Sequence, residues 1–126
     1  MLTDRQFIGF VHVTDGARAR AFYEGVLGLR AAYEDSFAVV FDAGGTQLRL
    51  TIVPEVPEPL GTDAGWLVDD IVATARELFA AGVILETFPG LDQDEDGVWE
   101  APGGDRIAWF RDPDGNRLSL TQPAPA

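Results

Sequence analysis

The residue best suited to acid–base chemistry in this chain is its single histidine, His12. It lies in an apolar run over 7–13, which predicts a strand whose alternate side chains share one face. Ile8, Phe10 and His12 therefore lie on the same side of that strand. His12 can bind a ligand or move a proton near neutral pH, or it can fill the sheet face with a satisfied hydrogen bond. The chain has no cysteine, and no serine lies in a nucleophile elbow, so no catalytic triad is indicated.

A second polar set lies in a motif that the chain contains twice. Residues 45–51 read GTQLRLT and residues 115–121 read GNRLSLT, so both fit G-x-x-L-x-L-T. Arg49 suits an anionic or carbonyl group of a ligand, and an ion pair with a nearby carboxylate is the alternative. If the leucines pack beneath helices, the polar residues that alternate with them face a cleft: Arg49 and Thr51, and Ser119 and Thr121.

The helices that must position these strands are also duplicated. ARAFY at 19–23 is echoed by ARELF at 75–79, and each follows an acidic helix start. A short chain made of two like halves is typical of two copies of one unit, and a cleft often forms where copies meet. Each helix is expected to begin at a polar cap and to end at a glycine: Thr14 or Asp15 to Gly28, and Asp69 or Asp70 to Gly82.

The remaining elements complete an α+β unit used twice. Strands are expected at 37–42, 46–53, around 67–68, 83–88, 106–110 and 116–121, with a DPDG turn at 112–115. An acidic loop at 89–104 contains a possible short strand at 98–99. The proline-rich segment 54–60 predicts a linker. We therefore expect one domain over 1–126, with modules at 1–53 and 61–122 and a tail at 123–126.

Composition narrows the classes of function. The chain has 126 residues, a net charge of −12 and 46% hydrophobic residues, enough for one packed core. Nucleic-acid binding is disfavoured because phosphate contacts need a basic face. The acidic charge would attract a cationic ligand, or it serves solubility alone. No stretch is apolar enough to span a membrane and no signal peptide is visible, so we expect a cytoplasmic protein without a membrane partner.

Three stretches together resemble the vicinal oxygen chelate superfamily, which includes glyoxalase I, extradiol dioxygenases and bleomycin-resistance proteins. They are DGARARAFYEGVLGL at 15–29, VDDIVATARELFAAG at 68–82 and IAWFRDPDGNRLSL at 107–120. The resemblance implies two βαβββ modules that form a curved mixed sheet with a concave ligand cleft. It also implies that the first helix packs on the face opposite His12, so that His12 points toward the cleft.

The resemblance also places the family's metal ligands, which are usually His, Glu or Gln. The four matching positions hold Ile8, Arg49, Asp63 and Ser119. Isoleucine cannot bind a metal, arginine repels a cation, and Asp with Ser is a weak donor set. We therefore expect no metal and no other cofactor.

An acidic stretch at 92–97, DQDEDG, copies the first half of a calcium-binding EF-hand loop. The pattern then requires a glutamate where Gly103 stands, and it requires flanking helices. Neither requirement is met, so a solvated acidic loop is expected here.

These observations predict a metal-independent small-molecule binding protein of the bleomycin-resistance type, acting in antibiotic sequestration, as a homodimer. The ligand is expected to be aromatic or cationic. Of the tryptophans, Trp66 is expected in the core by strand parity, Trp99 is the best candidate for the cleft rim, and Trp109 is left open. The predicted ligand-binding residues are Phe10, His12, Arg49, Thr51, Asp63, Trp99 and Ser119.

Two other functions compete with this prediction. An atypical lyase, isomerase or epimerase would use His12 as the base and Arg49 as the electrophile. A structural or regulatory module would instead present an apolar groove to a partner protein. Turnover separates a binding protein from an enzyme, because only an enzyme consumes its ligand.

Overall fold

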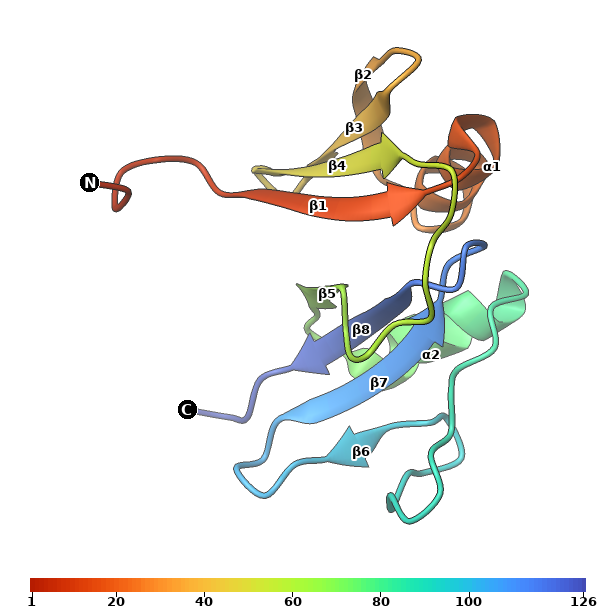
Figure 1. Ribbon diagram of the computed structural model, residues 1–126. Helices are drawn as coiled ribbons and strands as arrows, with labels where there is room; N and C mark the ends of the chain where they lie inside the picture. The colour runs from red at the N-terminus through yellow and green to blue at the C-terminus, as the bar shows by residue number, and fades with distance from the viewer. The chain divides into compact units, whose positions relative to one another are not determined.

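A computed structural model describes all residues from Met1 to Ala126, and the chain divides into two compact units (Figure 1). The first unit is Met1–Glu58 and the second is Pro59–Ala126. The boundary falls inside the proline-rich segment 54–60. No helix in the structure combines the length and the apolar character that a membrane crossing demands.

The first unit is a four-stranded mixed sheet with one helical segment. The sheet order is β1-β4-β3-β2, with β1 parallel to β4 and the other pairs antiparallel. The helical segment packs on β3 and β4. The elements are β1 (Ile8–Val13), α1 (Gly16–Arg20), the π-helix η1 (Ala21–Val26), β2 (Arg30–Glu34), β3 (Ala38–Ala43) and β4 (Thr46–Ile52).

The second unit repeats this arrangement, as the duplicated motifs predict. Its sheet order is β5-β8-β7-β6, again with the first strand parallel to the last and the others antiparallel. The helix α2 packs on β7 and β8 (Figure 1). The elements are β5 (Ala64–Leu67), α2 (Ile71–Ala80), β6 (Trp99–Glu100), β7 (Arg106–Arg111) and β8 (Arg117–Gln122). The α+β fold with two βαβββ modules is thereby confirmed.

The two helical segments differ by one residue, and this explains the π-helix. Asp15 caps the first by accepting from the Arg18 amide, and Asp70 caps the second by accepting from the Ala73 amide. The glycines that follow adopt positive φ, 76° at Gly28 and 91° at Gly82, as helix ends require. One residue more separates cap from glycine in the first unit. The wider turn of a π-helix accommodates such an insertion while keeping Tyr23 buried.

The cores confirm the predicted strand parity. The leucines of both G-x-x-L-x-L-T motifs are buried, on the sheet faces that the helices cover. In the first unit Tyr23 stacks on Phe41 with ring centroids 5.9 Å apart, which joins the helical segment to β3. In the second, Ile71, Ala75 and Leu78 form the buried stripe of α2. Each sheet therefore has one face beneath a helix and one open face.

The structure contradicts the strand expected at 83–88. This segment has no strand assignment and makes one ladder-like hydrogen bond, from the Glu86 amide to the Trp109 carbonyl at 2.7 Å. The Gln93 side chain makes hydrogen bonds to backbone groups of this segment that a neighbouring strand would otherwise make. Its Oε1 accepts from the Phe88 amide, and its Nε2 donates to the carbonyls of Glu86 and Gly97, all within 2.9 Å. Side-chain hydrogen bonds that satisfy the backbone locally compete with strand pairing.

Two smaller differences concern strand ends. The strand β2 was not expected from the sequence, and it contains two adjacent alanines and a bulge between Ala31 and Tyr33. Gln122 ends β8, and its side-chain Oε1 accepts from the Ile71 amide at 2.9 Å, helping Asp70 to cap α2. The last strand therefore holds the start of the helix in place.

Replacing Gln93 tests its structural role. Gln93→Ala removes three side-chain hydrogen bonds and leaves partly buried backbone groups unsatisfied, so we expect a loss of about 2 kcal/mol in the free energy of unfolding. Urea denaturation measures the loss. Asp92→Ala, at an exposed neighbouring position, is the matched control and should change stability little. Equal stabilities for the two variants would contradict the role given to Gln93.

Candidate ligand-binding faces

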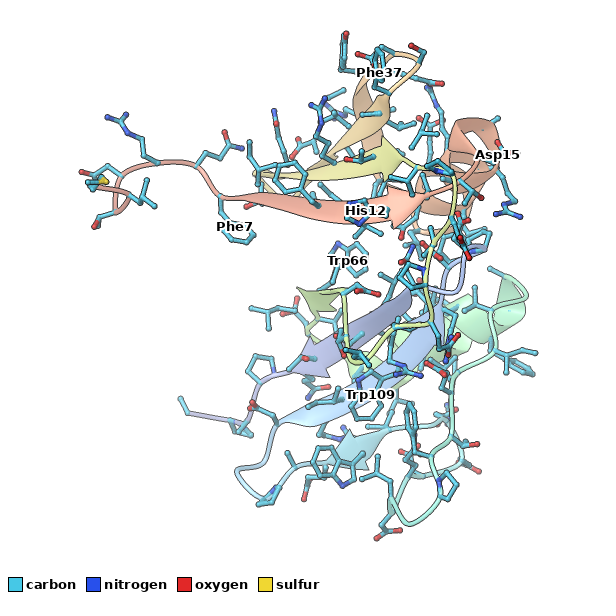
Figure 2. All side chains as sticks on the ribbon, in the orientation of Figure 1. Phe7, His12, Asp15, Phe37, Trp66 and Trp109 are labelled. Atoms are coloured by element: carbon cyan, nitrogen blue, oxygen red, sulfur yellow. The ribbon has the colours of Figure 1, made fainter.

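The open face of the first sheet carries the predicted site residues of that unit. Phe10 on β1 lies opposite Arg49 on β4, and His12 lies opposite Thr51. Phe10 and His12 are exposed, while Arg49 and Thr51 are half-buried. Figure 2 labels His12 on β1. The structure thus brings these four residues together on one surface.

Arg49 is the centre of a row that crosses all four strands of the sheet. Its register neighbours are Phe10 on one side and Val40 on the other, and Val40 in turn lies opposite Tyr33. The bulge in β2 brings Tyr33 into this row. Arg49 makes no hydrogen bond or salt bridge in the structure. The guanidinium therefore keeps its planar donor fork available on an otherwise apolar row.

Tyr33 and Asp35 form a fixed polar pair close to Arg49. The Tyr33 hydroxyl donates to Asp35 Oδ2 at 2.9 Å, which raises the pKa of the phenol. Asp35 Oδ1 accepts from the amides of Phe37 and Ala38. The Phe37 amide, followed by the Tyr33 hydroxyl, lowers the pKa of Asp35, and the charge of Arg49 lowers it further. The carboxylate stays ionised, so it orients Tyr33 and offsets part of the Arg49 charge.

The open face of the second sheet is aromatic. Trp99 lies opposite Ile107, and Trp109 lies opposite Ser119. The Trp99 and Trp109 rings are 6.2 Å apart with a tilt of 30°, and Phe88 meets Trp109 edge to face at 5.4 Å. Trp99 therefore lies on the same face as Trp109, whose place the sequence left open. Trp66, which was expected in the core, lies opposite Leu120 on the face that α2 covers, but it is only half-buried.

Three charged residues border this aromatic cluster. Glu86 Oε1 accepts from Arg117 Nε at 2.9 Å, and Glu86 Oε2 accepts from Arg111 Nε at 3.1 Å. The Arg117 guanidinium also lies 5.2 Å from the centre of the Phe88 ring. Burial of Glu86 raises its pKa, but the hydrogen bonds from Arg117 and Arg111 outweigh burial and leave the pKa lowered. One carboxylate thus holds two arginines in fixed positions.

The two predicted residues of the second unit differ in how accessible they are. Ser119 is buried on the open side of the sheet, where a Cβ at Gly65 would collide with its Oγ. Asp63 is exposed, and its Oδ2 accepts from the Arg117 amide at 3.1 Å, which ties the start of β5 to β8. Asp63 therefore has a structural role, and Ser119 has little surface to offer a ligand.

The residues at the family's metal positions do not fit a metal. Ile8 and Arg49 lie on the first unit's open face and supply no metal donor, and Asp63 with Ser119 is a weak donor set. No group of three or more His, Cys, Asp or Glu side chains could hold an ion. In the EF-hand-like stretch, Asp94 Oδ1 accepts from the amides of Asp96 and Val98 instead.

The charged border and part of the aromatic cluster were not predicted from the sequence. Phe88 and Glu86 fall in the segment expected to be a strand, so their side chains had no predicted target. Arg111 and Arg117 flank the DPDG turn, and they pair directly across the β7–β8 ladder. That hairpin register was a signal from which two neighbouring arginines could have been found.

The contribution of Glu86 to the stability of the fold should depend on pH. Glu86→Gln weakens the hydrogen bonds that charge strengthens, so we expect a loss of about 2 kcal/mol at pH 7. Because the folded-state pKa of Glu86 is lowered, its contribution is complete above the unfolded value, about 4.3. It is lost as the pH falls through the folded-state pKa, so the stability difference between the two proteins should narrow below about pH 4. Thermal denaturation across this range tests the prediction. Glu77→Gln, a substitution at an exposed position on α2, is the control and should have the stability of the unmodified protein at every pH.

The comparisons with known proteins agree with this geometry. A family model described as the Glyoxalase/Bleomycin resistance protein/Dioxygenase superfamily matches residues 8–120. A solved member of that superfamily from Sphaerobacter thermophilus is 22% identical, with a TM-score of 0.76 over 98% of this chain and 100% of that one. No curated protein sequence matches the chain.

Two further solved structures resemble the chain. A glyoxalase family protein from Enterococcus faecalis is 20% identical, with a TM-score of 0.74 over 97% of this chain and 100% of that one. A lactoylglutathione lyase from Agrobacterium tumefaciens is 20% identical, with a TM-score of 0.72 over 94% of this chain and 93% of that one. At such identities these similarities show a shared fold alone. Because the family model spans most of the sequence, the chain belongs to the glyoxalase/bleomycin resistance protein/dioxygenase superfamily.

Proposed function

We propose that this protein is a metal-independent binding protein for an aromatic small molecule, of the bleomycin-resistance type. The observation that carries the proposal is the aromatic open face of the second sheet, where Trp99 and Trp109 lie side by side. Ligand sites are mostly apolar with a few placed polar groups, and this face has that composition. The open face of the first sheet, with Phe10 and Arg49, is the second candidate surface.

The energetics of such a face are sufficient without a metal. An aromatic ligand that loses about 200 Å² of apolar surface to Trp99 and its neighbours gains about 5 kcal/mol before ordering costs. Two or three hydrogen bonds add about 1 kcal/mol each. The gross gain of about 7 to 8 kcal/mol is reduced by the ordering costs, so micromolar affinity is its upper limit. Stacking and hydrogen bonding therefore supply a driving force for binding that does not depend on a metal.

The charged groups on the open faces favour an aromatic ligand that carries an oxygen acceptor. Arg49 has an available donor fork, and Glu86 fixes Arg111 and Arg117 beside the tryptophans. Each arginine can donate to a carbonyl, phenolate or carboxylate oxygen. The net charge of −12 acts differently, because it favours the approach of a cationic molecule from solution.

A second candidate function is that of an atypical lyase or isomerase. His12 and Arg49 lie on neighbouring strands and on the same face, one register row apart. Side chains related in this way are within reach of one small substrate. In this reaction class His12 would take a proton next to a carbonyl, and Arg49 would hold the resulting oxyanion.

A ligand screen tests the binding proposal. Thermal shift against polyaromatic antibiotics, cationic glycopeptides and 2-oxo compounds should identify one stabilising class. Tryptophan fluorescence then gives its affinity, and Trp99→Ala should weaken binding about tenfold because a stacking surface is lost. Leu60→Ala, at a fully exposed apolar position outside both sheets and outside every candidate site, is the control and should bind as tightly as the unmodified protein.

The same ligand separates the two functions. Recovery of the unchanged ligand after prolonged incubation supports a binding protein. A conversion that His12→Ala abolishes while affinity is kept would establish the enzyme instead.

Metal independence has its own test. The protein should purify without stoichiometric metal, and dialysis against a chelator should leave the affinity for the ligand unchanged, because Ile8 and Arg49 supply no metal donor. Elemental analysis and titration before and after dialysis measure both. One Zn, Ni, Mn or Fe per chain, with binding restored by that metal, would rule out this part of the proposal.

A further inference from the structure

The second unit contains a cavity of about 240 Å³ away from the open face of its sheet. It lies between α2 and the irregular segment 84–97. Its apolar lining comes from Ala75, Phe79, Ile84 and Leu85, and its charged lining comes from Arg76, Glu95 and Asp96. None of these residues takes part in the two candidate ligand faces.

The apolar side of this cavity is unusually exposed. Phe79 is 70% exposed and Ile84 is 79% exposed, although both line the same hollow. Phe79 follows Leu78 and lies one turn after Ala75, so it extends the buried stripe of α2 beyond the core. Ile84 lies beside it in the irregular segment, where Gln93 Nε2 donates to the carbonyl of Glu86. Two large apolar side chains thus share a surface that nothing in the unit covers.

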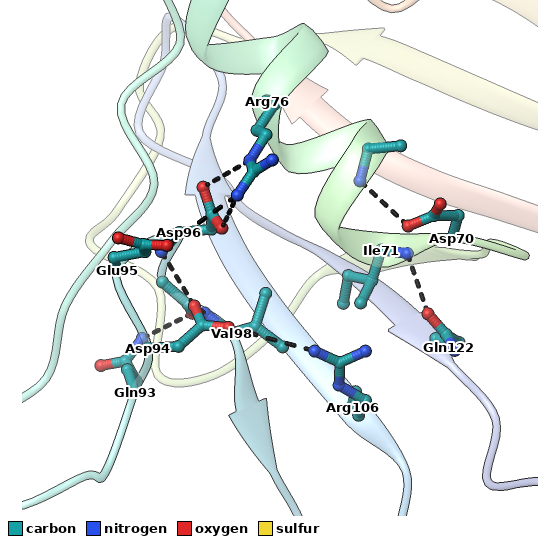
Figure 3. Close-up of polar contacts among 12 residues, drawn as sticks. Asp70, Ile71, Arg76, Gln93, Asp94, Glu95, Asp96, Val98, Arg106 and Gln122 are labelled. Carbon is teal, nitrogen blue, oxygen red and sulfur yellow. Dashed lines mark hydrogen bonds and ion pairs between the residues drawn. The ribbon is translucent and has the colours of Figure 1, made fainter.

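The charged side of the cavity has an excess of carboxylate. Figure 3 shows Arg76 reaching from α2 to Asp96, with Nε–Oδ1 at 3.2 Å and Nη2–Oδ2 at 3.3 Å. This two-point contact occupies Arg76. Glu95 approaches Arg76 only at 3.9 Å, and its side chain is 86% exposed. Two carboxylates therefore share one guanidinium, and the more distant of them, Glu95, stays exposed beside the apolar floor.

We propose that this cavity is a second binding site, which takes a small primary amine attached to one apolar ring. The volume is below the usual range for drug-sized ligands, about 300–1,000 Å³, and it suits one ring with a short chain. The ring would cover Phe79 and Ile84, and the ammonium would bind Glu95. The excess carboxylate disfavours an anionic ligand, and a neutral ligand would leave Glu95 with only its 3.9 Å contact to Arg76.

The probe for this site is 2-phenylethylammonium, titrated into the full-length ¹⁵N-labelled protein and followed by NMR. We expect saturable shifts of backbone amides within residues 75–97, with a dissociation constant on the order of 1 mM. The neutral 2-phenylethanol and the anionic phenylacetate should bind at least about threefold more weakly. Added salt should weaken the binding of the ammonium compound.

Exposed substitutions test which side chains are used. Glu95→Gln should weaken binding about threefold through loss of an exposed ion pair, and Phe79→Ser about tenfold through loss of apolar contact. Glu77→Gln makes the same charge change on α2 outside the cavity and should stay within about twofold of the unmodified protein. The site is refuted if shifts are absent or unsaturated at 20-fold the expected constant, or if phenylacetate binds equally well. It is also refuted if Glu77→Gln and Glu95→Gln weaken binding alike.

Discussion

Each four-stranded sheet of this protein has two faces but only one helical segment to cover them. One face of each sheet therefore stays open, and the candidate ligand-binding residues lie on these open faces. Leu48 and Leu50 in one unit, and Leu118 and Leu120 in the other, place the apolar side of each sheet beneath its helix. Strand alternation then forces the intervening residues onto the opposite face. Nothing within either unit covers that face with a second helical layer. The side chains there are selected by what they meet outside the sheet rather than by core packing.

The two open faces have diverged within the same framework. Arg49 in the first unit and Ser119 in the second occupy the same position of the repeated motif. Phe10 lies opposite Arg49, and Gly65 lies opposite Ser119, so these two positions also correspond. In the first unit the pair is an aromatic ring beside an available cation. In the second it is a glycine with a buried serine above it, and the aromatic surface has moved along the row to Trp109. The duplicated fold therefore supplies two different surfaces, as expected where function is grafted onto a scaffold.

Much of the fold follows from the sequence because its signals are local and repeated. Asp15 and Asp70 as caps, Gly28 and Gly82 as stops, and the DPDG turn each act within a few residues, and each lies where it was predicted. The failure at 83–88 arises from a side chain that lies just beyond the segment. The segment 83–88 alternates like a strand, yet Gln93 satisfies its backbone from outside the sheet. No pattern within 83–88 reveals that competitor.

The candidate site residues also fall into a group that strand alternation places correctly and a group that depends on contacts between strands. Parity paired Phe10 with His12 and Arg49 with Thr51, because β1 and β4 are regular strands, and the resemblance to the family put both pairs on the side of the cleft. Parity could not reveal that Ser119 is buried against Gly65 or that Asp63 is used by the Arg117 amide, since both depend on contacts between strands. The charged border was also hidden, because Glu86 reaches Arg111 and Arg117 from an irregular segment. The irregularity at 83–88 thus has a consequence for the site. The side chains of Glu86 and Phe88 contact residues of β7 and β8 from this irregular segment. They form the polar and aromatic edge of the candidate ligand face.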